Sequence, residues 1–214
     1  MNKTLKYLLR ISLLLDNWLY TVQSRLAIRV YGYHPKHDYL RYADWFKDHI
    51  TPDDIVADIG SNTGKMANDI ADKARFVFGV EIEKELSDIA VKTYSRSNLL
   101  FVNEDGTKFD FESRKITVVT LSNVLEHIDE RVSFMSDLVK SLGAGSKILI
   151  RVPMIDRDWR VFLKKDLGVD YRLDPTHFTE FTQFQFEDEL ERAGIFIEKL
   201  NIKFGEIYAV CAAK

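Results

Sequence analysis

The sequence predicts an α/β fold in which a mostly parallel sheet is flanked by helices and preceded by a helical extension. Short apolar runs at 55–59, 76–80, 99–102, 116–121 and 147–153 are typical of parallel strands buried on both faces. Between them, 66–74, 83–95 and 132–142 show helical spacing of apolar residues. Residues 182–185 predict a capping box that opens the last helix, and residues 195–202 and 206–213 predict two last strands joined by a tight turn at Phe204-Gly205. We therefore expect an extension over residues 1–50 and one domain over residues 51–214. Within the extension, a helix break is expected at 31–35 and a second helix over 36–50, with Tyr39 on its buried side.

Composition limits the class of protein. The chain has 214 residues, enough for one α/β domain with a full core. Its single cysteine, Cys211, excludes an internal disulfide and a cysteine zinc cluster. We find no apolar run of the roughly 20 residues that a membrane-spanning helix needs, and the start lacks the features of a signal peptide. We therefore expect a cytoplasmic protein.

Charge is distributed unevenly along the chain. Residues 1–41 hold seven Lys or Arg and two Asp, so the rest carries a net charge of −8 within a total of −3. An acidic main domain argues against a nucleic-acid partner. Residues 3–30 predict a helix with an apolar stripe and five basic residues. We expect this helix to pack on the domain or on a second subunit of a homodimer, and an interfacial helix on anionic lipid at the inner membrane face is the alternative.

The stretch after the first strand predicts a nucleotide site. The motif Asp58-x-Gly60-x-x-x-Gly64 places a glycine turn between a buried strand and a helix, where backbone N–H groups and a positive dipole end are available. Glu81 follows Gly60 by 21 positions, at the end of the second strand, where a carboxylate accepts hydrogen bonds from ribose hydroxyls. Asn62 stands between the glycines, and asparagine tolerates left-handed backbone well.

This motif resembles the first motif of class I S-adenosylmethionine (SAM)-dependent methyltransferases, which have a Rossmann-like fold. Ser122-Asn123-Val124-Leu125-Glu126-His127-Ile128, after the fourth strand, resembles the fourth motif of small-molecule methyltransferases. The final hairpin is similar to the family's ending, in which one antiparallel strand is inserted into the sheet. The likeness covers about residues 36–213 and is nearest to type-11-like enzymes, including enzymes that act on glycans.

The resemblance implies SAM as cofactor and assigns its contacts. In the family, a residue at the place of Asp58 lies near the methionine amino group, and one at the place of Asp105 contacts the adenine amino group. A turn aspartate with no ligand is the alternative for Asp105. The full set of expected cofactor contacts is Asp58, Gly60, Ser61, Asn62, Gly64, Glu81, Ile82, Asp105, Gly106, Ser122 and Asn123.

The acceptor side is expected in the long segment 154–180, since long connections at this sheet edge commonly carry function. His127 and His177 are the candidates for a general base, and either one could instead only cap a turn. Some related quinone-precursor methyltransferases bind a divalent metal through an acidic residue three positions before the Glu-His pair. Asn123 occupies that position here, so we expect no metal.

We therefore predict an enzyme that transfers a methyl group to a small-molecule or glycan acceptor, at a hydroxyl oxygen. A non-catalytic SAM-binding protein is one alternative. An NAD-linked oxidoreductase is another, disfavoured by the G-x-x-x-G spacing and by the final hairpin. The motif of DNA amino-methyltransferases and the paired-glutamate loop of protein arginine methyltransferases are both absent.

Overall fold

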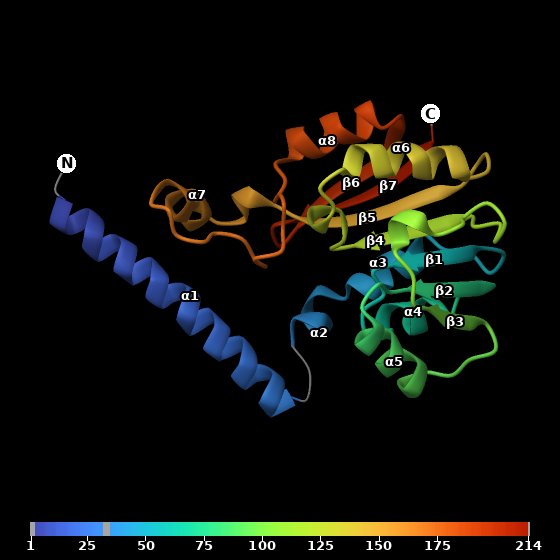
Figure 1. Ribbon diagram of the computed structural model, residues 1–214, viewed down its shortest axis with the longest axis horizontal. Coiled ribbons are helices and arrows are strands. Elements are labelled where there is room, and N and C mark those ends of the chain that lie inside the picture. Colours follow the sequence, from blue (N-terminus) through green and yellow to red (C-terminus); the bar gives the residue numbers. More distant parts are fainter. Residues whose placement is uncertain (1–2, 32–34, 214) are drawn as a thin grey trace.

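The computed structural model describes residues 3–31 and 35–213, and places one seven-stranded sheet at the centre of the domain (Figure 1). The strand order is β3-β2-β1-β4-β5-β7-β6. The strands are β1 (Ile55–Ile59), β2 (Phe76–Val80), β3 (Leu99–Val102), β4 (Val118–Ser122), β5 (Lys147–Pro153), β6 (Ile195–Lys203) and β7 (Glu206–Ala213). Neighbouring strands from β3 to β5 are parallel, and β7 lies antiparallel between β5 and β6. The predicted fold class is confirmed.

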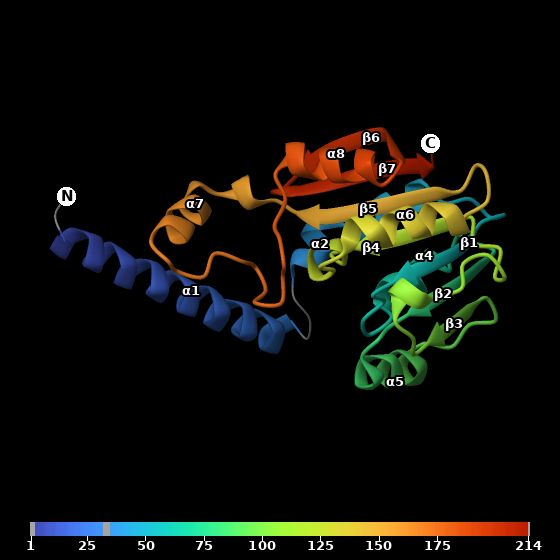
Figure 2. The same ribbon diagram turned by 45° about the horizontal axis from the view of Figure 1, so that its top comes forward.

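Two helical layers cover the sheet (Figure 2). Helices α3 (Tyr42–Asp48) and α4 (Lys65–Ile70) contribute Phe46, Ala67 and Ile70 to the core on one face. Helices α6 (Arg131–Ser141) and α8 (Gln183–Arg192) cover the other face, where Leu138 and Phe186 are buried. Helix α5 (Lys84–Thr93) precedes β3. Burial on both faces explains why the parallel strands appear in the sequence as continuous apolar runs.

The final hairpin has the predicted turn. Phe204 and Gly205 both have positive φ, 53° and 74°, as a two-residue type I′ turn requires. The N-cap of α8 was also predicted: Thr182 Oγ1 accepts a hydrogen bond from the Gln185 backbone N–H at 3.1 Å. The reciprocal half of the expected capping box is missing, because the Gln185 side chain bonds Thr179 and Glu189 instead.

The extension differs from expectation in one place. One helix was expected over residues 36–50, with Tyr39 on its buried side. The structure has two, α2 (Lys36–Leu40) and α3, separated by Arg41 at a φ of 44°, and Tyr39 is exposed. The break turns α3 so that Phe46 reaches the core. The predicted helix break at 31–35 falls partly on residues 32–34, which lie outside the described residues.

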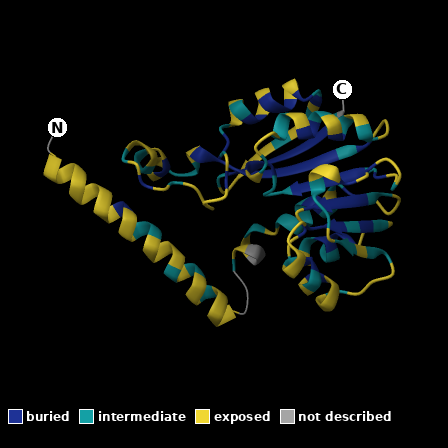
Figure 3. Ribbon diagram, in the orientation of Figure 1, coloured by how far each residue is buried: buried dark blue, intermediate teal, exposed yellow. Residues whose placement is uncertain are grey.

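Helix α1 (Lys3–Tyr31) projects from the domain and is exposed along most of its length (Figure 3). It contacts the segment 154–180, which contains a helix that the sequence analysis did not predict, α7 (Trp159–Asp166). Within residues 3–31 and 35–213, no helix combines the length and apolar character needed to cross a membrane.

Candidate functional site

The carboxyl ends of β1 and β4 form the centre of the candidate site. These strands are adjacent, and the chain leaves them toward opposite halves of the sheet, to β2 and to β5. Loops that depart in opposite directions open a crevice, which is where open α/β sheets bind ligands.

The loop after β1 is held tightly against β2. The N–H groups of Gly60 and Ser61 both donate to the carbonyl oxygen of Val80, at 2.9 and 3.0 Å. Gly60 has a φ of 69°, and a Cβ there would lie 2.7 Å from Cγ2 of Val124. Glycine is therefore required by backbone conformation and by the close approach of the β4 loop. Asn62 has a φ of 51°, which confirms its expected left-handed backbone.

Glu81 braces the same loop. Its carboxylate accepts hydrogen bonds from the N–H of Asn62 at 2.8 Å and from the N–H of Glu83 at 2.9 Å. A carboxylate offers about four lone-pair sites, so both oxygens keep capacity for ribose hydroxyls. The Asn103 side-chain amide donates to the backbone carbonyls of Glu81 and Ile82 at 2.8 and 2.9 Å. These bonds hold the backbone of Ile82 beside the loop, and the Ile82 side chain is exposed.

Asp105 begins a short turn after β3. Its Oδ1 accepts from the Thr107 N–H at 3.0 Å and from the Thr107 hydroxyl at 2.7 Å. The bond from the Thr107 hydroxyl is the largest cause, and together the two bonds hold the pKa of Asp105 below its usual value. The turn role that we considered is therefore present, and a contact with adenine stays a prediction. A Cβ on Gly106 would lie 2.4 Å from Cγ2 of Ile59, so glycine lets this turn approach β1.

Asp58 is fully buried at the end of β1. Its Oδ1 accepts a hydrogen bond from the Thr120 hydroxyl at 2.7 Å, and its Oδ2 has no partner among the described residues. Burial raises the pKa of Asp58 to about 7; the Thr120 bond opposes this rise and the charge of Glu81 adds to it. Ionising the Asp58 carboxyl is therefore unfavourable in the protein alone, and a bound cationic group would make it favourable.

Five buried polar atoms without a hydrogen-bond partner occur among the described residues, and all lie at the carboxyl end of β1 or in the loops that follow β1 and β4. They are Asp58 Oδ2, Ser61 Oγ, Asn123 Oδ1, Glu126 Oε1 and Glu126 Oε2. Buried polar atoms normally have partners, and each exception needs an explanation. A polar ligand bound in the crevice between these strands would supply one.

The β4 loop is fixed by the neighbouring strand. Asn123 has a φ of 57°, and its N–H donates to the carbonyl of Arg151 at 2.8 Å. The Arg151 guanidinium donates to Ser122 Oγ at 3.2 Å and forms a buried, two-bond ion pair with Glu206, at 2.6 and 2.7 Å. Ser122 Oγ accepts this one bond and keeps its proton as a donor, whereas the buried Asn123 amide oxygen has no partner among the described residues.

The two candidate histidines meet, although 50 positions separate them. Their ring centroids are 4.6 Å apart, in an edge-to-face arrangement. The Phe178 N–H donates to the carbonyl of Glu126 at 2.8 Å, which joins the segment 154–180 to the β4 loop. Burial, with a smaller contribution from His177, lowers the pKa of His127, so its neutral form dominates at pH 7.

A hydrogen-bond chain assigns the tautomer of His127. The Thr176 hydroxyl lies 2.6 Å from Asp174 Oδ1 and 2.9 Å from His127 Nδ1. An ionised carboxylate only accepts, so the single hydroxyl proton is assigned to the bond with Asp174. His127 Nδ1–H then donates to Thr176, which leaves Nε2 as a proton acceptor. His177 is anchored likewise, with Nδ1 at 3.3 Å from Glu180 Oε1.

Glu126 completes this cluster. One potential ligand atom from each of Glu126, His127 and His177 lies within 4.8 Å of the others, so these residues could hold a divalent cation. Burial raises the pKa of Glu126 to about 8, which makes it a neutral acid at pH 7 in the protein alone. The expected absence of a metal stays a prediction.

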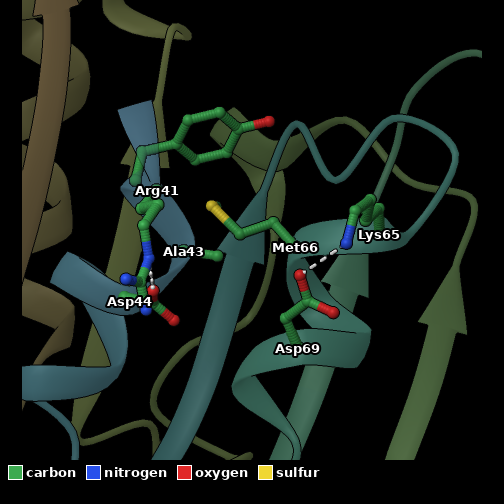
Figure 4. Close-up of a pocket in the computed structure, with 7 residues that line it drawn as sticks. Arg41, Ala43, Asp44, Lys65, Met66 and Asp69 are labelled. Atoms are coloured by element: carbon green, nitrogen blue, oxygen red, sulfur yellow. Dashed lines mark hydrogen bonds and ion pairs between the residues drawn. The ribbon is translucent and has the colours of Figure 1, made fainter. Parts of the chain in front are cut away.

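A hollow of about 250 Å³ lies beside the loop after β1, between the first turns of α3 and α4 (Figure 4). Tyr42, Lys65 and Met66 line it, and Lys65 forms an ion pair with Asp69 at 2.8 Å. The Tyr42 ring also lies under the Arg151 guanidinium, 4.3 Å from its centre. The extension thus reaches the edge of the β4 loop through Tyr42.

A family model described as a methyltransferase domain matches residues 57–150, the part of the chain that runs from β1 to β5. It therefore includes both the glycine loop and the Glu126-His127 pair. This match and the strand order of the sheet support a class I SAM-dependent methyltransferase. The strand order with its one antiparallel strand is that of the class, and SAM is its cofactor.

Among similar proteins, a SAM-dependent methyltransferase from Methanosarcina mazei shares the fold, with a TM-score of 0.65, 15% identity and coverage of 79% of this chain and 97% of that one. A ubiquinone biosynthesis O-methyltransferase from Coxiella burnetii is 23% identical over 63% of this chain and 58% of its own length. A ribosomal RNA small subunit methyltransferase A from Mesomycoplasma hyopneumoniae is 33% identical over 37% of this chain and 30% of its own length. The chain thus spans less than two thirds of these curated relatives.

The residues predicted from the sequence lie toward one edge of the sheet, and their contacts with cofactor and acceptor stay predictions. Three further residues of this arrangement were not among the candidates. Glu126 was quoted only as part of a motif, and Thr176 and Glu180 orient the histidines. The spacing Asp174-Pro175-Thr176 is typical of an aspartate-capped turn and could have indicated Thr176. The pairing with His127 depends on tertiary structure and leaves no local signal.

Proposed function

We propose that this chain transfers the methyl group of SAM to a hydroxyl oxygen of a small-molecule or glycan acceptor. The observation that carries the proposal is the gathering of unpartnered buried polar atoms at the ends of β1 and β4, next to a histidine with a free Nε2. Cofactor and acceptor would occupy the two sides of this crevice. When bound, SAM supplies an electrophilic methyl group on its sulfonium.

The residues of the loop after β1 fit this cofactor. Asp58 Oδ2 would accept from the α-ammonium group, and the Glu81 carboxylate from the ribose hydroxyls. Asp105 Oδ2 would accept a hydrogen bond from the adenine amino group, and the same oxygen lies 3.1 Å from Lys108 Nζ. The exposed Ile82 side chain would cover the adenine ring.

His127 is the general base of this proposal. Its Nε2 accepts the proton of the acceptor hydroxyl as that oxygen forms its new bond to carbon, and Asp174 stabilises the resulting imidazolium through Thr176. His177 and the neutral Glu126 acid line the same place and can hydrogen-bond the acceptor.

The first test is calorimetric titration with SAM, S-adenosylhomocysteine and NAD. Binding of the two adenosyl sulfur compounds alone is expected, and binding of NAD alone would refute the proposal. A screen with SAM labelled on its methyl group then separates catalysis from mere binding. Its acceptors are nucleotide sugars, glycan fragments, hydroxylated aromatics and a small-subunit rRNA fragment, each assayed with and without chelator.

The base is tested by a pair of variants. His127→Gln should lower kcat by about 10²–10⁴-fold and abolish the fall in rate at acid pH that His127 protonation causes. Thr176→Val should retain cofactor binding and shift this pH profile, because it disconnects the Asp174 carboxylate from the imidazole. An unchanged profile in both variants would exclude His127 as the base.

A further inference from the structure

Helix α1 is attached to the rest of the protein along one narrow side. Leu13 is its only buried side chain among the described residues. Asp16 pairs with Lys164 at 2.8 Å and with Arg160 at 3.1 Å, and the Asn17 amide donates to the carbonyl of Asp170 at 2.8 Å. These polar contacts of α1 all reach the segment 154–180, which contains α7.

The opposite side of α1 is apolar and exposed. At 100° per residue, Leu15 lies about 200° around the helix from Leu13. Large apolar side chains surround Leu15 at three- and four-residue steps, and each is 36% to 64% exposed. This outer stripe consists of Leu8, Ile11, Leu15, Trp18, Leu19 and Leu26. A contiguous stripe of this kind on a projecting helix marks an interaction surface.

The charges of α1 indicate which surface covers the stripe. The helix holds five basic residues, and its only acidic residue, Asp16, is already paired inside the protein. Two copies of α1 packed through their stripes would bring these like charges together, whereas an anionic lipid surface complements them. The remainder of the chain is acidic and would be repelled by such a surface, so α1 alone would lie on it.

We infer that α1 lies in the plane of an anionic lipid surface, with the outer stripe in the acyl boundary and Arg25 and Arg29, which lie on the same side of the helix, at the headgroups. Trp18 and the neighbouring Tyr7 suit this depth, since aromatic side chains with a polar atom favour the interface. The ion pairs of Asp16 then hold α7, and with it the segment that bears His177, on the side of α1 that faces away from the outer stripe. This inference rests on α1 and does not depend on the acceptor proposed above.

The test is flotation of the full-length protein with phosphatidylcholine vesicles that contain or lack phosphatidylglycerol, without SAM. Binding is expected only to the anionic vesicles, and it should weaken as salt is raised. The double variant Leu15→Ser/Trp18→Ser should bind roughly tenfold or more weakly, because it removes two anchors from the stripe. Arg25→Gln/Arg29→Gln should lose part of the binding and its salt dependence.

The matched control is Phe196→Ser, which removes an equally exposed aromatic side chain from β6 and should bind vesicles like the unaltered protein. S-adenosylhomocysteine affinity and thermal unfolding check that each variant is folded. Equal flotation of Leu15→Ser/Trp18→Ser and the unaltered protein would overturn the inference. A protein that stays free of vesicles but forms a dimer that this variant dissociates would show that a second copy covers the stripe.

Discussion

We predict that cofactor affinity rises with pH, because in the proposed site Asp58 has to ionise to receive the α-ammonium group. Burial raises the pKa of this carboxyl to about 7 in the protein alone. The α-amino group has a pKa of about 7.7–8.0, so the ligand stays cationic up to neutral pH. Roughly 3% of Asp58 is ionised at about pH 5.5 and about half at pH 7, so affinity should increase roughly fifteenfold, or about 1.6 kcal/mol.

The assay is calorimetric titration with S-adenosylhomocysteine across this range, in two buffers of different ionisation enthalpy. Binding should release about one proton at pH 5.5 and about half a proton at pH 7. Asp58→Asn should bind more weakly, with no dependence on pH from this group. Asp105→Asn is the control: the pKa of Asp105 lies below its usual value, so its loss should leave the slope unchanged. Constant affinity with no proton release would refute the assignment of Asp58 to the ammonium.

Three further outcomes follow from the geometry. Gly64→Ala should lower the free energy of unfolding, measured in urea, by about 1–3 kcal/mol, because the new Cβ would lie 2.5 Å from Phe101 Cζ at a φ of 83°. The control is Gly145→Ala, which has a φ of 82° but open space around it and should destabilise less. Equal destabilisation by the two variants would show that the clash does not matter. Burial raises the pKa of Glu126 to about 8, so the native state binds more protons than the unfolded one and stability should fall as pH rises from about 4.5 to 8. The urea midpoint of Glu126→Gln should not fall over this pH range. If the variant and the unaltered protein show the same dependence on pH, Glu126 is not the group responsible. Arg151→Met should destabilise the protein by about 3–5 kcal/mol, because it leaves the buried Glu206 carboxylate without its cation. Adding Glu206→Gln to this variant should recover part of the lost stability. Purely additive losses from the two substitutions would contradict the pairing.

Most of the fold was predictable because parallel strands and their turns carry local signals. The strand β1 was placed to the residue from an apolar run that ends in glycine, and the hairpin turn from Phe204-Gly205. Strand β4 is shifted by up to two residues from the expected range, since its ends are set by pairing with β1 and β5.

The exceptions depend on contacts that a sequence does not show. Arg41 has a positive φ that nothing in its sequence neighbours predicts, and Phe46 in the helix that follows is fully buried. Helix α7 is short and was included in a connecting segment, although Asp158 caps its first turn in an ordinary way. The sequence could nominate both histidines, but only the folded chain shows that their rings touch and that Thr176 fixes one of them.

The segment between β5 and α8 closes on itself at its base. Met154 forms a parallel bridge with Phe181, and the backbone bonds from Ile155 to Phe181 and from Phe181 to Pro153 are 2.9 and 3.1 Å long. These contacts at the end of the sheet offset the entropy lost in closing the segment, and that entropy grows only slowly with the length of the segment. Such a segment can change its size and side chains over evolution while the strands below keep their register. Asp16 adds one condition, because Arg160 and Lys164 bind it: α1 and this segment would have to diversify as a unit.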